Sequence, residues 1–172
     1  ALNAPAVMGY LDVQHGRGTF ISRDLPLADV SVSKLKSALH AGSLLDLIEL
    51  RETLECRAAE LAAERVEARQ MTRLRQAVHE MEGSADDYQR FFKADLEFHL
   101  AVAEASHNDL LYQLYILTRR LVSEVIAQLV HGLTVREDSV KLQQEILLAI
   151  RSRRPAAARA AALAHMEYIR PF

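Results

Sequence analysis

Residues 88–111 read YQRFFKADLEFHLAVAEASHNDLL, and the apolar residues of this segment recur with the 3.6-residue period of an α-helix. We predict a helix over about 85–106. Its apolar face carries Phe91, Phe92, Val102, Ala103 and Ser106. Asp95 and His99 lie four residues apart on this same face, so a carboxylate and an imidazole point together into the expected core. A buried carboxylate needs a cation, a hydrogen-bond donor or a metal. The spacing alone is equally typical of a hydrogen bond within one helix.

The composition indicates a helical, globular protein. The chain has 172 residues, of which 50% are hydrophobic and 26% charged, enough for one domain with a large core. Only 6 Gly and 4 Pro favour helix over sheet. The net charge of -2 argues against a chain whose bulk attracts nucleic acid. A single cysteine, Cys56, excludes an internal disulfide. No apolar run or leader segment suggests a membrane, so we expect a cytoplasmic protein without membrane contact.

Capping residues and glycines divide the remaining chain into elements. Two short strands, 10–14 and 19–22, are expected to form a hairpin around the glycine-containing turn at 15–18. Further helices are predicted at about 31–40, 43–66, 72–82, 109–130, 135–151 and 155–169. The predicted fold is therefore all-α, a six- to seven-helix antiparallel bundle preceded by a short β-hairpin.

Several of these helices carry polar residues on faces that should be apolar. They are Arg51 and Glu55 on 43–66, Gln143 on 135–151 and His165 on 155–169. Together with Asp95 and His99 they predict a polar centre inside the bundle. Carboxylate and imidazole ligands suit a divalent transition metal such as Zn, Ni, Mn or Fe. Arg51 offers a guanidinium suited to a carboxylate ligand, but Arg51 and Glu55 could also simply pair with each other.

Several motifs, in this order, resemble one family of bacterial regulators. They are LDVQHGRGTFI at 11–21, IELRETLE at 48–55, DLEFH at 95–99, ASHN at 105–108, ILLAI at 146–150 and AAALAH at 160–165. The chain resembles a GntR-type transcription regulator of the FadR subgroup. The resemblance implies that 1–23 are the remnant of a winged helix-turn-helix, with 11–21 as its wing. It also implies that 24–172 form the helical effector-binding and dimerisation domain.

The resemblance also implies roles for individual residues. Asp95, His99 and His165 would bind a divalent transition metal (Zn, Ni or Mn), and Arg51 and Glu55 would face a small carboxylate effector. The family has a further histidine ligand where this chain has Gln143. The amide of Gln143 would therefore bind the metal through water, touch the effector or signal a lapsed metal site. His15 and Arg17 in the wing would contact DNA.

We therefore expect the ligand-sensing part of a homodimeric transcription regulator rather than an enzyme. Operator DNA would be read only through the full winged helix-turn-helix, and residues 1–172 alone should not bind DNA specifically. Two alternatives remain open. One is a metal-dependent enzyme using the same cavity, for which Glu55 is the candidate general base. The other is a helical interaction module whose polar centre is purely structural.

Overall fold

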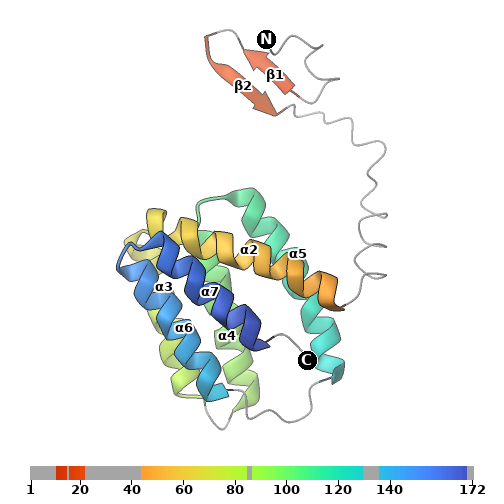
Figure 1. The fold of residues 1–172 in the computed structure, drawn as a ribbon, viewed down its shortest axis with the longest axis vertical. Helices are drawn as coiled ribbons and strands as arrows, with labels where there is room; N and C mark the ends of the chain where they lie inside the picture. Colours follow the sequence, from red (N-terminus) through yellow and green to blue (C-terminus); the bar gives the residue numbers. More distant parts are fainter. Residues whose placement is uncertain (1–10, 15, 22–43, 85–86, 130–135, 170–172) are drawn as a thin grey trace. The chain divides into compact units, whose positions relative to one another are not determined.

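A computed structural model describes residues 11–14, 16–21, 44–84, 87–129 and 136–169 of the chain (Figure 1). The chain divides into two units, Ala1–Gly42 and Ser43–Phe172. The second unit contains the helices α2 (Leu44–Arg65), α3 (Ala68–Glu82), α4 (Tyr88–Ala105), α5 (Asp109–Leu129), α6 (Arg136–Arg151) and α7 (Pro155–Ile169). The predicted all-α class is confirmed. The predicted helix at 31–40 and the predicted domain boundary at 23/24 lie outside the described residues.

The first unit contains one antiparallel hairpin among its described residues. Strand β1 (Leu11–Gln14) pairs with β2 (Gly18–Ile21) in the register Leu11 with Ile21 and Gln14 with Gly18. Gly16 has a φ of 77°, a conformation that suits glycine, and the amide of Arg17 donates to the carbonyl of Gln14 at 2.9 Å. The strands lie where the sequence predicts them. Their identity as the wing of a DNA-binding domain stays a prediction.

Local capping explains where three of the helices begin. The Asp87 side chain accepts a hydrogen bond from the amide of Arg90 and starts α4, three residues later than expected. The Asn108 side chain accepts from the amide of Leu111 and starts α5, as predicted. Helix α3 begins at Ala68 rather than at 72, so that prediction was wrong. The cap is Glu67, which forms a capping box with Gln70, and glutamate is not among the usual N-cap residues.

Helix α2 packs against α4, α5, α6 and α7, and α3 packs against α4 and α6. The inner face of α2 is made largely of small side chains: Ala58, Ala59, Ala62 and Ala63 are all buried. Helix α7 contributes buried Ala158 and Ala162. Such small side chains allow two helices to approach closely. Arg51 and Glu55 precede these alanines on α2, so a polar region adjoins the apolar core.

An arginine side chain fixes the end of α2. Arg153, between α6 and α7, has a φ of 54°. Its Nη1 donates to the Glu64 carbonyl at 2.9 Å and its Nη2 to the Val66 carbonyl at 2.6 Å. The last carbonyls of a helix have no partners within the helix. Arg153 supplies those partners from a distant part of the chain and ties the α6–α7 turn to α2.

We predict that Arg153→Ala lowers the free energy of unfolding by about 1–3 kcal/mol, because two charge-assisted hydrogen bonds are lost. Alanine and arginine have the same free-energy cost in the left-handed backbone conformation, so the loss of stability reports the contribution of the guanidinium alone. Urea unfolding measures it. The control is exposed Arg154→Ala, for which we expect a change within roughly 0.5 kcal/mol. Equal losses in both variants would contradict the capping role.

Candidate functional site

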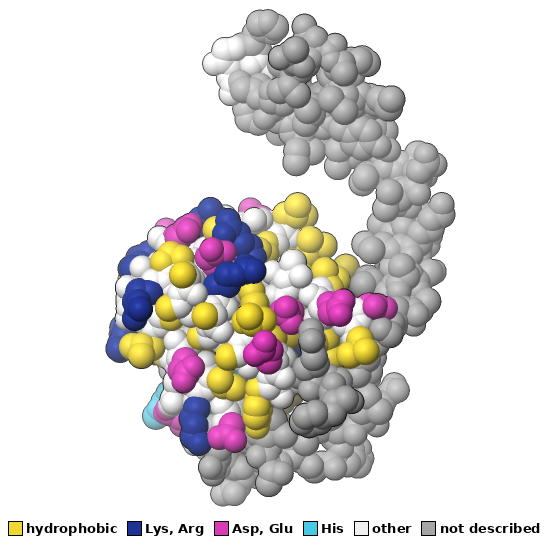
Figure 2. All heavy atoms as spheres, in the orientation of Figure 1, with side chains coloured by type: hydrophobic (Ala, Val, Ile, Leu, Met, Phe, Trp, Pro, Cys, Tyr) yellow, Lys and Arg dark blue, Asp and Glu magenta, His cyan; other side chains and the backbone are white. Residues whose placement is uncertain are grey.

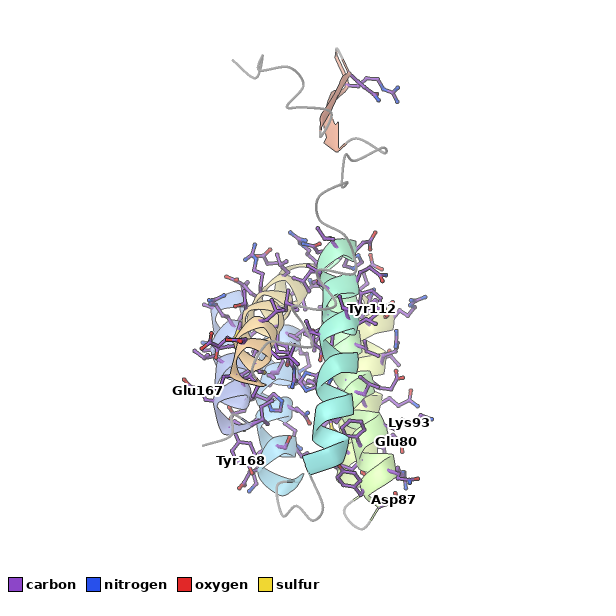
Figure 3. All side chains as sticks on the ribbon, turned by 90° about the vertical axis from the view of Figure 1, so that its right-hand side faces the viewer. Glu80, Asp87, Lys93, Tyr112, Glu167 and Tyr168 are labelled. Atoms are coloured by element: carbon purple, nitrogen blue, oxygen red, sulfur yellow. The ribbon has the colours of Figure 1, made fainter. Side chains whose placement is uncertain are left out.

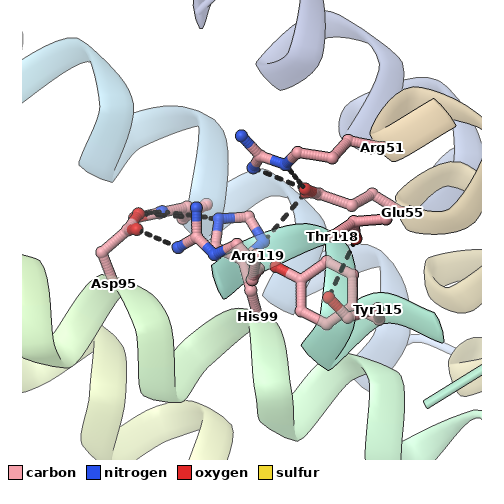
Figure 4. A network of polar contacts seen from close by, with 8 residues as sticks. Arg51, Glu55, Asp95, His99, Tyr115, Thr118 and Arg119 are labelled. Atoms are coloured by element: carbon pink, nitrogen blue, oxygen red, sulfur yellow. Dashed lines mark hydrogen bonds and ion pairs between the residues drawn. The ribbon is translucent and has the colours of Figure 1, made fainter. Parts of the chain in front are cut away.

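Polar side chains from five helices lie together inside the bundle. Figure 4 shows those of α2, α4 and α5. We call this group the polar cluster. It consists of Arg51 and Glu55 from α2, Asp95 and His99 from α4, Arg119 from α5, Gln143 from α6 and His165 from α7. Gln143 is 0% exposed and the side chain of Asp95 is 13% exposed. The structure thus brings together every interior residue that the sequence predicts for the site.

Glu55 is held by two groups. Its Oε1 accepts hydrogen bonds from Nε of Arg51 at 2.9 Å and from Nη2 of Arg51 at 2.6 Å. Its Oε2 lies 3.1 Å from Nδ1 of His99. Burial disfavours the ionised carboxyl, but Arg51 and His99 outweigh burial and lower the pKa of Glu55. Glu55 is therefore a buried carboxylate, and the pairing with Arg51 that the sequence left open does occur.

Asp95 is held in the same manner by different residues. Its Oδ2 accepts a hydrogen bond from Nη2 of Arg119 at 2.5 Å, and its Oδ1 accepts from Nε2 of Gln143 at 2.5 Å. Burial disfavours the ionised form, yet Arg119 and then His99 outweigh burial and hold the pKa of Asp95 well below its ordinary value. Asp95 is thus a second carboxylate inside the bundle, largely but not fully buried, with a resident guanidinium.

His99 lies between the two ion pairs. Its Nδ1 faces Glu55, and its Nε2 lies 3.5 Å from Oδ1 of Asp95 and 3.3 Å from Nε2 of Gln143. Burial favours the neutral imidazole, but the two carboxylates outweigh burial and raise the pKa of His99. One imidazole therefore links the carboxylates of α2 and α4.

His165 completes a possible ligand set. Its ring centroid lies 5.0 Å from that of His99. Burial, and then the neighbouring His99, lower the pKa of His165 to about 4, so its imidazole is neutral at neutral pH, as a metal ligand must be. One ligand atom each from Glu55, His99 and His165 lie within 4.8 Å of one another. The expected set had Asp95 where this group has Glu55, and Asp95 is bound by Arg119 and Gln143 instead.

Buried polar atoms at this site lack a hydrogen-bond partner among the described residues. They include Nδ1 of His165, Oε1 of Gln143 and the hydroxyl oxygen of Tyr115. Buried polar atoms are nearly always satisfied, by protein, water or a ligand. A cavity of about 10 Å³ is lined by Glu55, His99 and Tyr115 and otherwise by apolar side chains. That volume is about one water molecule or one ion. A space of this size can hold a water molecule or an ion but not a metabolite.

The contribution of α5 to the polar cluster was not predicted from the sequence. Tyr115, Thr118 and Arg119 are all buried on its inner face, and Thr118 donates to the Tyr115 carbonyl at 2.9 Å. The sequence did contain a signal for this inner face, because Leu111, Tyr115 and Thr118 recur with the helical period.

The hairpin residues predicted to contact DNA are far in sequence from the residues of the polar cluster. Arg17 is exposed, and His15 lies outside the described residues.

A larger hollow, of about 540 Å³, lies on the surface between α3 and α4. Its charged side chains already form exposed ion pairs, such as Arg90 with Glu80 at 2.6 Å and Arg73 with Glu97 at 3.2 Å. Figure 3 shows Glu80 and Lys93 pointing away from the bundle. Figure 2 shows charges of both signs mixed with hydrophobic side chains over one face. Size alone therefore does not identify the site, and the smaller buried cavity is the better candidate.

The chain is similar to a known protein family and to several known regulators. The FCD domain matches residues 46–168. LutR of Bacillus subtilis, an HTH-type transcriptional regulator, is 34% identical over 120 residues, which are 66% of this chain and 52% of LutR. NanR of Cronobacter sakazakii, an HTH-type transcriptional repressor, is 26% identical over 176 residues, which are 98% of this chain and 67% of NanR.

A solved structure, Streptococcus agalactiae GntR, superposes with a TM-score of 0.63 and 28% sequence identity. The match covers 95% of this chain and 75% of that one. The matched part of the chain spans only about half the length of LutR. The FCD match covers most of the chain, and the chain belongs to the FCD family, the effector-binding domain of GntR-type transcription regulators.

Proposed function

We propose that the helical unit senses a small carboxylate metabolite that binds beside a divalent transition metal in the polar cluster. The observation that carries this proposal is the convergence of Glu55, His99 and His165 within 4.8 Å, next to buried polar atoms that have no partner among the described residues. Ligand binding would favour one of two arrangements of the regulator and so change its affinity for operator DNA.

The chemistry of the residues suits a metal. Two imidazoles and a carboxylate are common ligands of Zn, Ni and Mn, and three protein ligands leave positions open for water or a bound anion. Nδ1 of His165, which lacks a partner among the described residues, is a neutral donor available to an ion. Asp95 is the further carboxylate within the cluster, and Gln143 lies beside it. We propose His99 and His165 as ligands, with Asp95 and Glu55 supplying carboxylates.

Arg51 supports the choice of a carboxylate effector. It is 1% exposed and presents its guanidinium toward the centre of the cluster, where it now binds Glu55 (Figure 4). A guanidinium binds a carboxylate with two parallel hydrogen bonds. An effector would take the place of Glu55 at Arg51, with Gln143 as a further contact.

The remaining parts of the proposal follow the relatives, which are named as transcription regulators. We propose a cytoplasmic homodimer that binds operator DNA through a winged helix-turn-helix, with Arg17 and His15 in its wing. Among the described residues no helix is long and apolar enough to cross a membrane.

An enzymatic role has little support, because Arg51 and His99 hold Glu55 as a carboxylate of lowered pKa, which makes it a weak base.

Metal binding should stabilise the folded chain, because an ion that binds only the native state shifts the folding equilibrium. We expect added Zn or Ni to raise the melting temperature and a chelator to lower it. His165→Ala should abolish both responses, whereas His79→Ala, at an exposed position on α3, should keep them. Elemental analysis without metal, together with melting curves indifferent to metal and chelator, would refute the metal site.

Arg51→Gln should weaken carboxylate binding by about 1.5–3 kcal/mol, the contribution of a charge-assisted hydrogen bond, while metal still binds. Calorimetric titration with a panel of short carboxylates, from acetate to citrate, measures this. The matched control is Arg57→Gln, because Arg57 lies on the same helix and pairs with Glu60 at 2.7 Å, but at the surface. Equal carboxylate affinities of Arg51→Gln and the wild type would show that Arg51 does not bind the effector.

A further inference from the structure

Arg119 forms an ion pair with Asp95, as Arg51 does with Glu55, but it reaches Asp95 from another helix. Its side chain is 8% exposed, and its Nη2 donates to Oδ2 of Asp95 at 2.5 Å. Asp95 is the carboxylate that does not join the group of Glu55, His99 and His165. A cation in contact with a carboxylate competes with a metal for the same oxygen atoms. Arg119 is thus placed to compete with a metal for Asp95.

A guanidinium released inside the bundle cannot remain without a partner. Leaving one member of a buried ion pair uncompensated is strongly destabilising. Arg119 would therefore need a new anion once a metal had taken Asp95. The same holds for Arg51 and Glu55. Metal binding would in this way turn two internal ion pairs into two cationic anchors.

The charge of the cluster indicates what those anchors bind. The two carboxylates balance the two guanidinium groups, and a histidine that binds metal is neutral. A divalent ion would then bring two excess positive charges into a buried site. Burial of unbalanced charge is costly. An anion with two negative charges restores the balance, whereas a monocarboxylate restores half of it.

We propose that Arg119 is the internal counter-ion that a metal displaces from Asp95, and that Arg119 and Arg51 together then select an effector with two acidic groups. This inference rests on the proposed metal and carboxylate site and names the class of its ligand. Metal and dianion bind with positive coupling, and linkage requires each to raise the affinity of the other by the same factor.

Calorimetry with zinc chloride, succinate and butyrate tests the inference on residues 1–172. Succinate and butyrate have the same chain length and differ in the second carboxylate. The zinc-loaded wild type should bind succinate at least about tenfold more tightly than it binds butyrate, as expected for one additional charge-assisted contact. It should also bind succinate more tightly than the zinc-free protein does. Equal binding of the two acids would overturn the inference.

Arg119→Gln keeps a hydrogen-bond donor but removes the charge. It should bind zinc about tenfold more tightly than the wild type, since the competing cation is gone, and it should lose the preference for succinate. Arg119→Lys retains the charge and should behave as the wild type. The matched control is Arg90→Gln, because Arg90 forms its ion pair with Glu80 at the surface. Zinc binding to Arg119→Gln that is no tighter than to the wild type would overturn the inference.

Asp95→Asn provides a test that does not require Arg119→Gln to fold. It removes the partner charge of Arg119, so the zinc-free variant should bind succinate more tightly than the zinc-free wild type does. An unchanged succinate affinity would count against Arg119 as an anchor. If zinc binds neither the wild type nor any variant, the proposed metal site fails as well. If zinc binds the wild type but the two acids bind equally, only this inference fails.

Discussion

Two carboxylates, those of Glu55 and Asp95, remain ionised inside this bundle because each is bound by the guanidinium of an arginine. Arg51 lies on the same helix as Glu55, but Arg119 reaches Asp95 from α5. His99 then joins the two pairs. Removal of one partner from such a pair is strongly destabilising, yet well-packed apolar residues in place of both are often as stable or more so. Stability alone therefore does not explain the cluster, which favours a ligand-related role.

The two sides of α2 have different packing. Toward α7 the contact is made largely of alanines and is close, and toward α5 it includes the buried Tyr115 and Arg119. The cavity lined by Glu55, His99 and Tyr115 has a volume of about 10 Å³, so a metabolite enters only if helices move apart. Because Arg119 links α5 to Asp95 of α4, we infer that exchanging the counter-ion of Arg119 weakens the α4–α5 contact. Such a change couples occupancy of the site to helix position.

The helical period was sufficient to predict the bundle and most of its interior polar residues. Arg51, Asp95 and Gln143 stand out because they interrupt apolar faces, and all of them lie in the cluster. Arg119 did not stand out, because it precedes Arg120 and two consecutive arginines on a helix usually indicate a solvent-exposed face. The pair of Arg51 and Glu55 lies within one helix and could be considered from the sequence. The partners of Asp95 come from α5 and α6, and periodicity within one helix contains no information about them.

Gln143 is the position where the chain departs from the expected histidine, and its contacts bear on whether the metal site is retained. Its Nε2 donates to Asp95, while its Oε1 has no partner among the described residues. The two ends of an amide are assigned from such contacts, and rotation by half a turn exchanges them. A metal that took Asp95 would remove the need for a donor there. The rotated amide would then present its oxygen to the ion, so we infer that Gln143 is compatible with both the metal-free and the metal-bound cluster.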